Sequence, residues 1–109
     1  MENTANDVQI YELEKVKFII RDACNLDIAY AYDDLVFSEH GIFIVQFVKN
    51  NPNELYCWFN AESPEKSVKP IFDSLKTTCD LNKVKITYMG RFEMNQKENS
   101  EEIDIRFIK

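Results

Sequence analysis

The stretch from Ile42 to Ala61 carries apolar side chains at both odd and even positions, and this pattern constrains the fold more than any other. Its two halves, 42–49 and 55–61, are predicted strands joined by a polar turn at 50–53. A strand pair with one wet face alternates apolar and polar residues. Because these two strands do not alternate in this way, we expect something to cover each face of the pair.

The pairing of the two strands decides which side chains share a face. If Val48 faces Leu55, then Val45 faces Trp58 across the hairpin. One face then carries Ile42, Ile44, Val48, Leu55, Cys57 and Phe59. The other face, which we call the predicted aromatic face, carries Phe43, Val45, Phe47, Tyr56 and Trp58.

The predicted aromatic face can be covered in two ways. If both predicted helices pack on the opposite face, its side chains stand open to water, and such a patch is typical of a protein interface. If one helix packs on each face, or if the sheet curls around its core, the same side chains belong to the core. The sequence leaves both alternatives open, and this face is the main candidate binding surface.

Helical spacing of apolar residues predicts one helix from about Val8 to Cys24 and a second over about 67–81, with residues 1–7 expected to be disordered. Tyr11 and Phe18 lie on one stripe of the first helix, among charged residues. Two aromatic residues on one solvated stripe suggest a contact. Tyr11 and Phe18 are therefore a second, smaller candidate patch.

Residues 84–94 and 103–107 alternate cleanly and are predicted to form a hairpin with one buried and one solvated face. We expect Phe92 to face Ile103 in this hairpin. Its apolar side would then continue from one strand to the other.

The order of predicted elements is α-β-β-β-α-β-β, which predicts one α+β domain over residues 1–109, with two helices on an antiparallel five-stranded sheet. From Val8 to Lys109 this order resembles the type III secretion chaperone-like fold, in which a helix, a three-strand meander, a second helix and a further hairpin follow one another. The resemblance rests on the order of elements and on no motif. It implies a dimeric, acidic module that binds another polypeptide.

The charge balance narrows the classes of partner. With 19 Asp and Glu against 13 Lys and Arg, the formal net charge is -6, which disfavours nucleic acids and anionic membranes. An acidic surface suits solubility or a basic partner. No apolar run reaches the ~20 residues of a membrane span, and residues 1–7 lack the pattern of a secretory leader. We therefore expect a cytoplasmic location.

Two glycines and one histidine exclude several kinds of site. Gly41 and Gly90 stand too far apart for either glycine-rich phosphate loop, and His40 alone cannot supply a paired-histidine metal motif. We expect no cofactor. The cysteines are odd in number, form no C-x-x-C pair and fall in apolar patterns, so we expect reduced core thiols at Cys24, Cys57 and Cys79.

Acidic residues near the histidine are the remaining chemical candidate: Asp33, Asp34, Glu39 and His40. If they met across a short hairpin, they could bind a metal or act as acid and base. The simpler interpretation makes them polar residues of turns. Asp33 and Asp34 then either bulge one strand over 28–37 or separate two short strands.

Three functions follow from these observations. The first is a non-enzymatic domain, expected to be a homodimer, that binds another polypeptide through the predicted aromatic face. The second is a small-molecule or metal-binding domain, with an enzyme as one form of it, that uses the acidic residues near His40. The third is an acidic inhibitor or immunity-type protein that binds one basic protein.

Overall fold

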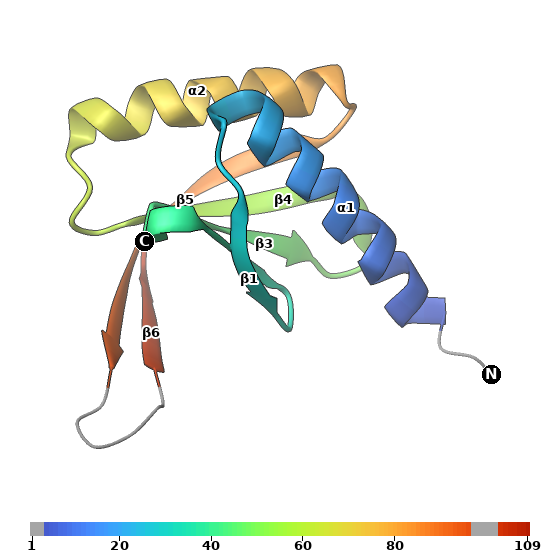
Figure 1. Cartoon of the computed structure of the whole chain (residues 1–109), viewed down its shortest axis with the longest axis horizontal. Helices are drawn as coiled ribbons and strands as arrows, with labels where there is room; N and C mark the ends of the chain where they lie inside the picture. Colours follow the sequence, from blue (N-terminus) through green and yellow to red (C-terminus); the bar gives the residue numbers. More distant parts are fainter. Residues whose placement is uncertain (1–3, 97–102) are drawn as a thin grey trace.

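Both helices of the described chain pack on one face of a sheet (Figure 1). The structure, a computed structural model, describes the backbone of residues 4–96 and 103–109 and the side chains of residues 13–95 and 104–109. Its elements are α1 (Thr4–Cys24), β1 (Ile28–Tyr32), β2 (Leu35–Ser38), a short 3-10 helix (Glu39–Gly41), β3 (Phe43–Val48), β4 (Asn51–Asn60), α2 (Glu65–Leu81), β5 (Lys85–Gln96) and β6 (Ile103–Ile108). The predicted α+β class is confirmed.

Helix α1 starts at Thr4, four residues before the expected start at Val8. The expectation of disorder over residues 1–7 falls partly on residues 1–3, which lie outside the described residues. For that segment it stays a prediction.

The described strands form one six-stranded sheet in the order β1-β2-β3-β4-β5-β6, so the prediction of five antiparallel strands is wrong. Strands β4 and β5 are parallel, whereas the other neighbours are antiparallel. Helix α2 explains the parallel pair. It follows β4 and carries the chain back along the sheet, so that β5 starts at the end where β4 started.

The extra strand arises at Asp33 and Asp34, which separate β1 from β2. Tyr32 pairs with Leu35 across these two residues, and Asp33 takes a left-handed φ of 59°. Aspartate and asparagine tolerate this conformation better than most residues. Since the chain has only two glycines, other turns also use non-glycine residues at positive φ: Asn25, His40, Asn50 and Lys83.

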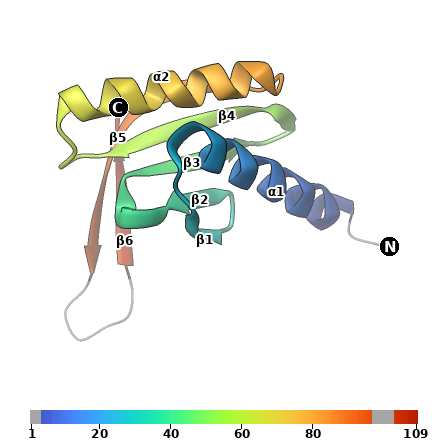
Figure 2. The same cartoon turned by 45° about the horizontal axis from the view of Figure 1, so that its top comes forward.

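The face of the sheet under α1 and α2, which we call the helix-covered face, holds the main core (Figure 2). Its fully buried side chains come from both helices and from the middle strands: Val16, Ile19, Ile20, Leu75, Cys79, Val36, Phe43, Val45, Cys57 and Phe59. The covering of this face by both helices leaves the opposite face without a helix.

The register of β3 and β4 differs by one residue from the predicted register. Phe47, not Val48, pairs with Leu55, and Ile44, not Val45, pairs with Trp58. The cause is the turn. Val48 already pairs with Asn51, so the turn consists of Lys49 and Asn50 alone. Residues 51–53, which were expected in the turn, belong to β4 instead, and the pairing is irregular between Phe47 and Val48.

This one-residue error divides the predicted aromatic face, because a slip of one residue sends a whole strand to the other side of a sheet. Phe43, Val45 and Phe47 lie on the helix-covered face, opposite Phe59, Cys57 and Leu55. Tyr56 and Trp58 lie on the other side, opposite Gln46 and Ile44.

Strand β5 changes sides part-way along its length. Tyr88 pairs with Cys57 and Gly90 pairs with Trp58, so Met89 is an extra residue that forms a bulge. Before the bulge, Tyr88 packs on the helix-covered face, with its ring centroid 5.8 Å from that of Phe72. After it, Phe92 packs with Trp58 on the opposite face.

Gly90 makes this change of side possible. It has a φ of 148°, which side chains other than glycine rarely adopt, and β6 passes so close that a Cβ would collide with the carbonyl oxygen of Ile108. Arg91 fixes the next position, because its Nη1 donates to the carbonyl oxygens of Asn60 and Ser63, both at 2.8 Å. The bend at Gly90 therefore lies between the close approach of β6 and the partly buried hydrogen bonds of Arg91.

The register of β5 and β6 also differs from the prediction, but with a milder effect. Phe92 pairs with Phe107 instead of Ile103, a shift of four residues. Because four is even, the same side chains still share a face. The predicted apolar side of this hairpin is therefore retained.

We predict that Gly90→Ala destabilises the chain by about 3 kcal/mol or more, since it adds a backbone collision to an unfavourable φ. Gly41→Ala is the matched control: Gly41 has a φ of 60°, but the nearest atom to a new Cβ lies 4.0 Å away. It should cost only about 1 kcal/mol. Urea unfolding measures both, and equal losses would contradict the close crossing at Gly90.

Candidate protein-binding face

The face of the sheet opposite the helices, which we call the open face, has a row of large side chains across it. Consecutive pairing places Tyr30 beside Phe37, Phe37 beside Ile44, Ile44 beside Trp58, and Trp58 beside Gly90. The row crosses the five neighbouring strands β1 to β5 and ends at Gly90, where the missing side chain leaves room for β6.

The centre of the open face is closed by the chain itself and not by a helix. Phe37, Ile44, Trp58 and Phe92 form a second buried cluster, and Trp58 is only 5% exposed. The ring of Phe107, from β6, lies 4.5 Å from the indole of Trp58. The sequence left two alternatives: both helices on one face of the sheet, or a sheet that curls around its own core. The structure has both features together.

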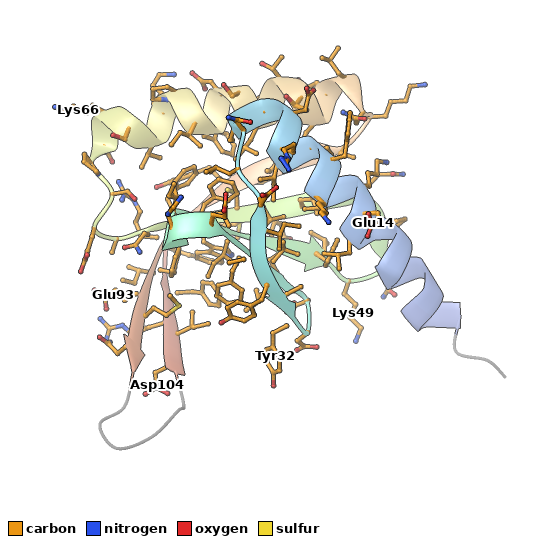
Figure 3. The ribbon with its side chains drawn as sticks, in the orientation of Figure 1. Glu14, Tyr32, Lys49, Lys66, Glu93 and Asp104 are labelled. Atoms are coloured by element: carbon orange, nitrogen blue, oxygen red, sulfur yellow. The ribbon has the colours of Figure 1, made fainter. Side chains whose placement is uncertain are left out.

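The border of this cluster is apolar and exposed. Tyr32 is 71% exposed and Tyr30 is 47% exposed, although the ring of Tyr30 stacks on Phe37 at 4.5 Å. Figure 3 shows Tyr32 pointing away from both helices. Met94 and Phe107 are exposed at the other side of the cluster. The open face thus has a buried centre and an accessible aromatic border.

A polar chain holds the centre of the open face in place. The indole Nε1 of Trp58 donates to Oε1 of Gln46 at 3.1 Å, and Nε2 of Gln46 donates to Oδ2 of Asp34 at 3.0 Å. The buried donor of Trp58 is therefore satisfied. Asp34 acts here as a positioning group for an aromatic side chain.

The predicted binding residues have separate positions in the structure. Phe43 and Val45 are fully buried under the helices, and Phe47 is half-buried against the same core. Of the predicted aromatic face, Tyr56 and Trp58 lie on the open face, where Tyr56 is half-buried. The exposed residues Tyr30 and Tyr32 were not among the predicted binding residues, although they alternate with alanines, a pattern that indicates a shared side of a strand.

The smaller predicted patch on α1 is described only in part. Phe18 is 57% exposed on the outer side of α1. Tyr11 lies within α1, but its side chain is outside the described side chains. A joint surface of these two residues stays a prediction.

The acidic residues near His40 do not come together. Asp33 and Asp34 precede β2, whereas Glu39 and His40 follow it. The four residues of β2 span roughly 13 Å and separate the two aspartates from Glu39 and His40. Oε1 of Glu39 accepts the backbone N–H of Asp27 at 2.8 Å. Within the described part of the chain no three His, Cys, Asp or Glu residues gather as a metal site. The four candidate residues therefore do not form one metal site in this part of the chain, and their positions agree with the simpler interpretation as polar residues of turns.

The three cysteines are free thiols, and Cys57 and Cys79 are buried. Burial raises the pKa of the Cys24 thiol to about 11 and that of Cys79 to about 11, and it raises the pKa of Cys57 well above its ordinary value. Nucleophilic cysteines have lowered pKa values. These three have the opposite shift, as expected for core thiols.

A groove of about 380 Å³ lies between α1 and α2, away from the open face. Its lining is mostly polar: Asp22, Ala23, Asp73, Ser74, Thr77 and Thr78. Nothing in this lining pairs a nucleophile with a base.

Comparison with known proteins gives no relative: the chain matches no protein-family model, no curated protein and no solved structure. The resemblance to the type III secretion chaperone-like fold therefore stays a prediction. Among the described helices, none is long and apolar enough to cross a membrane.

We predict that the native thiols react slowly with iodoacetamide. At pH 8 a thiol with a pKa of 9.0 is about one-tenth ionised, whereas a pKa of about 11 leaves roughly one-thousandth ionised. Alkylation of Cys24 and Cys79, followed by mass spectrometry, should be about a hundredfold slower than in urea and should keep increasing as the pH rises towards 11. Equal rates in native and unfolded chain would contradict the burial of the thiols.

Proposed function

We propose that this chain is a non-enzymatic protein-interaction domain that binds another polypeptide through the open face. The observation that supports this most directly is the exposed aromatic border of Tyr30 and Tyr32 beside a rigid, buried cluster around Trp58. Tyrosine, tryptophan and methionine are enriched at protein interfaces. A preformed cluster also reduces the side-chain ordering that binding would otherwise require.

The charge of the chain favours a basic segment in the partner. The formal net charge is -6, and Asp33 and Asp34 stand in the turn next to Tyr32. A basic polypeptide with apolar side chains would be attracted to this border and could pack on the tyrosine rings. The acidic inhibitor considered from the sequence is one form of the same proposal, in which the partner is a folded basic protein.

The proposed location is the cytoplasm. The three cysteines are free thiols, and free thiols suit a reducing compartment. We also propose a chaperone-like role, because the described groove of about 380 Å³ lies between the helices and the open face offers a row of aromatic side chains across several strands.

The test uses Trp58, the single tryptophan, as a reporter in the centre of the open face. Peptides are selected from a random library displayed on phage, and their binding to the wild-type chain is followed by the emission of Trp58. We expect Tyr32→Ser to weaken binding about tenfold or more, because it removes an exposed aromatic anchor.

Phe18→Ser is the matched control, since Phe18 is a similarly exposed aromatic residue on the helical side. It should leave affinity and the response of Trp58 unchanged. Peptides that lose affinity with Phe18→Ser, and not with Tyr32→Ser, would move the binding surface to α1. Peptides insensitive to Tyr32→Ser and to Tyr30→Ser would overturn the proposal.

A further inference from the structure

Strand β6 forms one edge of the sheet, and its outer backbone groups face no strand among the described residues. Such an edge is a template for another strand. The other edge, β1, is interrupted by an irregularity between Ile28 and Tyr30, a feature that protects edges from pairing. By contrast, β6 pairs with β5 in one unbroken register from Ile103 to Ile108. The regular edge is therefore the better template.

No helix covers β6. Figure 1 shows the hairpin of β5 and β6 projecting from the sheet away from α1 and α2, and Figure 3 shows Glu93 and Asp104 on this hairpin. The side chains of Asp104, Arg106 and Phe107 are exposed. The segment between Asp104 and Ile108 contains no proline, and its two charged residues, Asp104 and Arg106, have opposite signs.

The sequence of β6 is complementary to itself about Ile105. In an antiparallel pair centred there, Ile105 faces its own copy, Asp104 faces Arg106 of the second copy, and Arg106 faces Asp104 of the second copy. Opposite charges directly across an antiparallel pair stabilise it, whereas like charges destabilise it. The charge pattern thus selects a second copy of this chain over an arbitrary strand.

We infer that two copies of this chain associate through β6 in a two-fold antiparallel pair, which joins their two sheets into one. Arg106 already lies 3.1 Å from Oε1 of Glu93 in its own chain. In the dimer it stands between that carboxylate and Asp104 of the second copy. Asp104 of each copy then faces Arg106 of the other copy, an opposite charge directly across the pair.

The dimer also extends the open face. Ile105 and Phe107 lie on the apolar side of the hairpin, so pairing of β6 places these side chains of both copies next to each other. This inference does not depend on the proposed function, because it uses the edge of β6 and not the border of Tyr30 and Tyr32.

Two charge reversals test the pairing. Asp104→Arg gives an edge with two arginines, and Arg106→Asp gives an edge with two aspartates. We expect each variant alone to dissociate about tenfold or more readily than the wild-type dimer in sedimentation equilibrium. Mixed in equal amounts, the two variants should form a heterodimer, because each arginine then faces an aspartate. Thermal melts of each variant establish that it is folded.

Lys66→Glu is the control, with the same change of charge as Arg106→Asp at an exposed position on α2. It should dimerise like the wild type. A wild-type chain that stays monomeric at the highest soluble concentration overturns the inference, as do folded variants that dimerise as tightly as the wild type. Failure of the two variants to form a heterodimer also overturns it. Peptide binding to the open face, followed by Trp58, can still be measured in monomeric variants, so the two proposals fail separately.

Discussion

On the two sides of Gly90, strand β5 carries alternating apolar side chains, yet Ile86 packs in the core under the helices and Phe92 packs in the cluster on the open face. The bulge at Met89 and the bend at Gly90 cause the change, and the rest of the open face depends on it. Without the bend, Phe92 would point towards the helices. With it, Phe92 and Phe107 close over Trp58, so the second face of the sheet has a core although no helix covers it.

The same bend explains how both apolar faces of the β3 and β4 pair are covered. The helix-covered face takes Phe43, Val45 and Phe59, and the hairpin of β5 and β6 covers the centre of the open face. Only the border, with Tyr30 and Tyr32, stays accessible. Hydrogen bonds from Trp58 to Gln46 and from Gln46 to Asp34 hold the indole beside this border, and the ring of Tyr30 stacks on Phe37 of the same cluster.

The sequence alone predicts the two helices, the strand segments and the apolar side of the last hairpin, because each depends on local periodicity. It does not predict register, which depends on turns. A turn of two residues at Lys49 and Asn50 shifts β4 by one residue, so that Trp58 lies on the opposite face of the sheet from Phe43 and Val45. An error of four residues in the last hairpin leaves its faces unchanged. The parallel pairing of β4 and β5 and the bend at Gly90 require tertiary contacts, which local patterns do not contain. Of the predicted binding residues, Trp58 and Tyr56 therefore lie on the open face, whereas Tyr30, Tyr32 and Phe107 were not predicted.

The position of the Trp58 indole is the most direct test of this account. Nuclear Overhauser contacts from the indole protons, measured on the isotope-labelled chain, report which side chains surround it. The account predicts strong contacts to the ring of Phe107 and to the methyl groups of Ile44, and none to the helix side chains Val16 or Leu75. Contacts from the indole to Val16 or Leu75, without contacts to Phe107, would place Trp58 under the helices and contradict the bend, the register and the open face together.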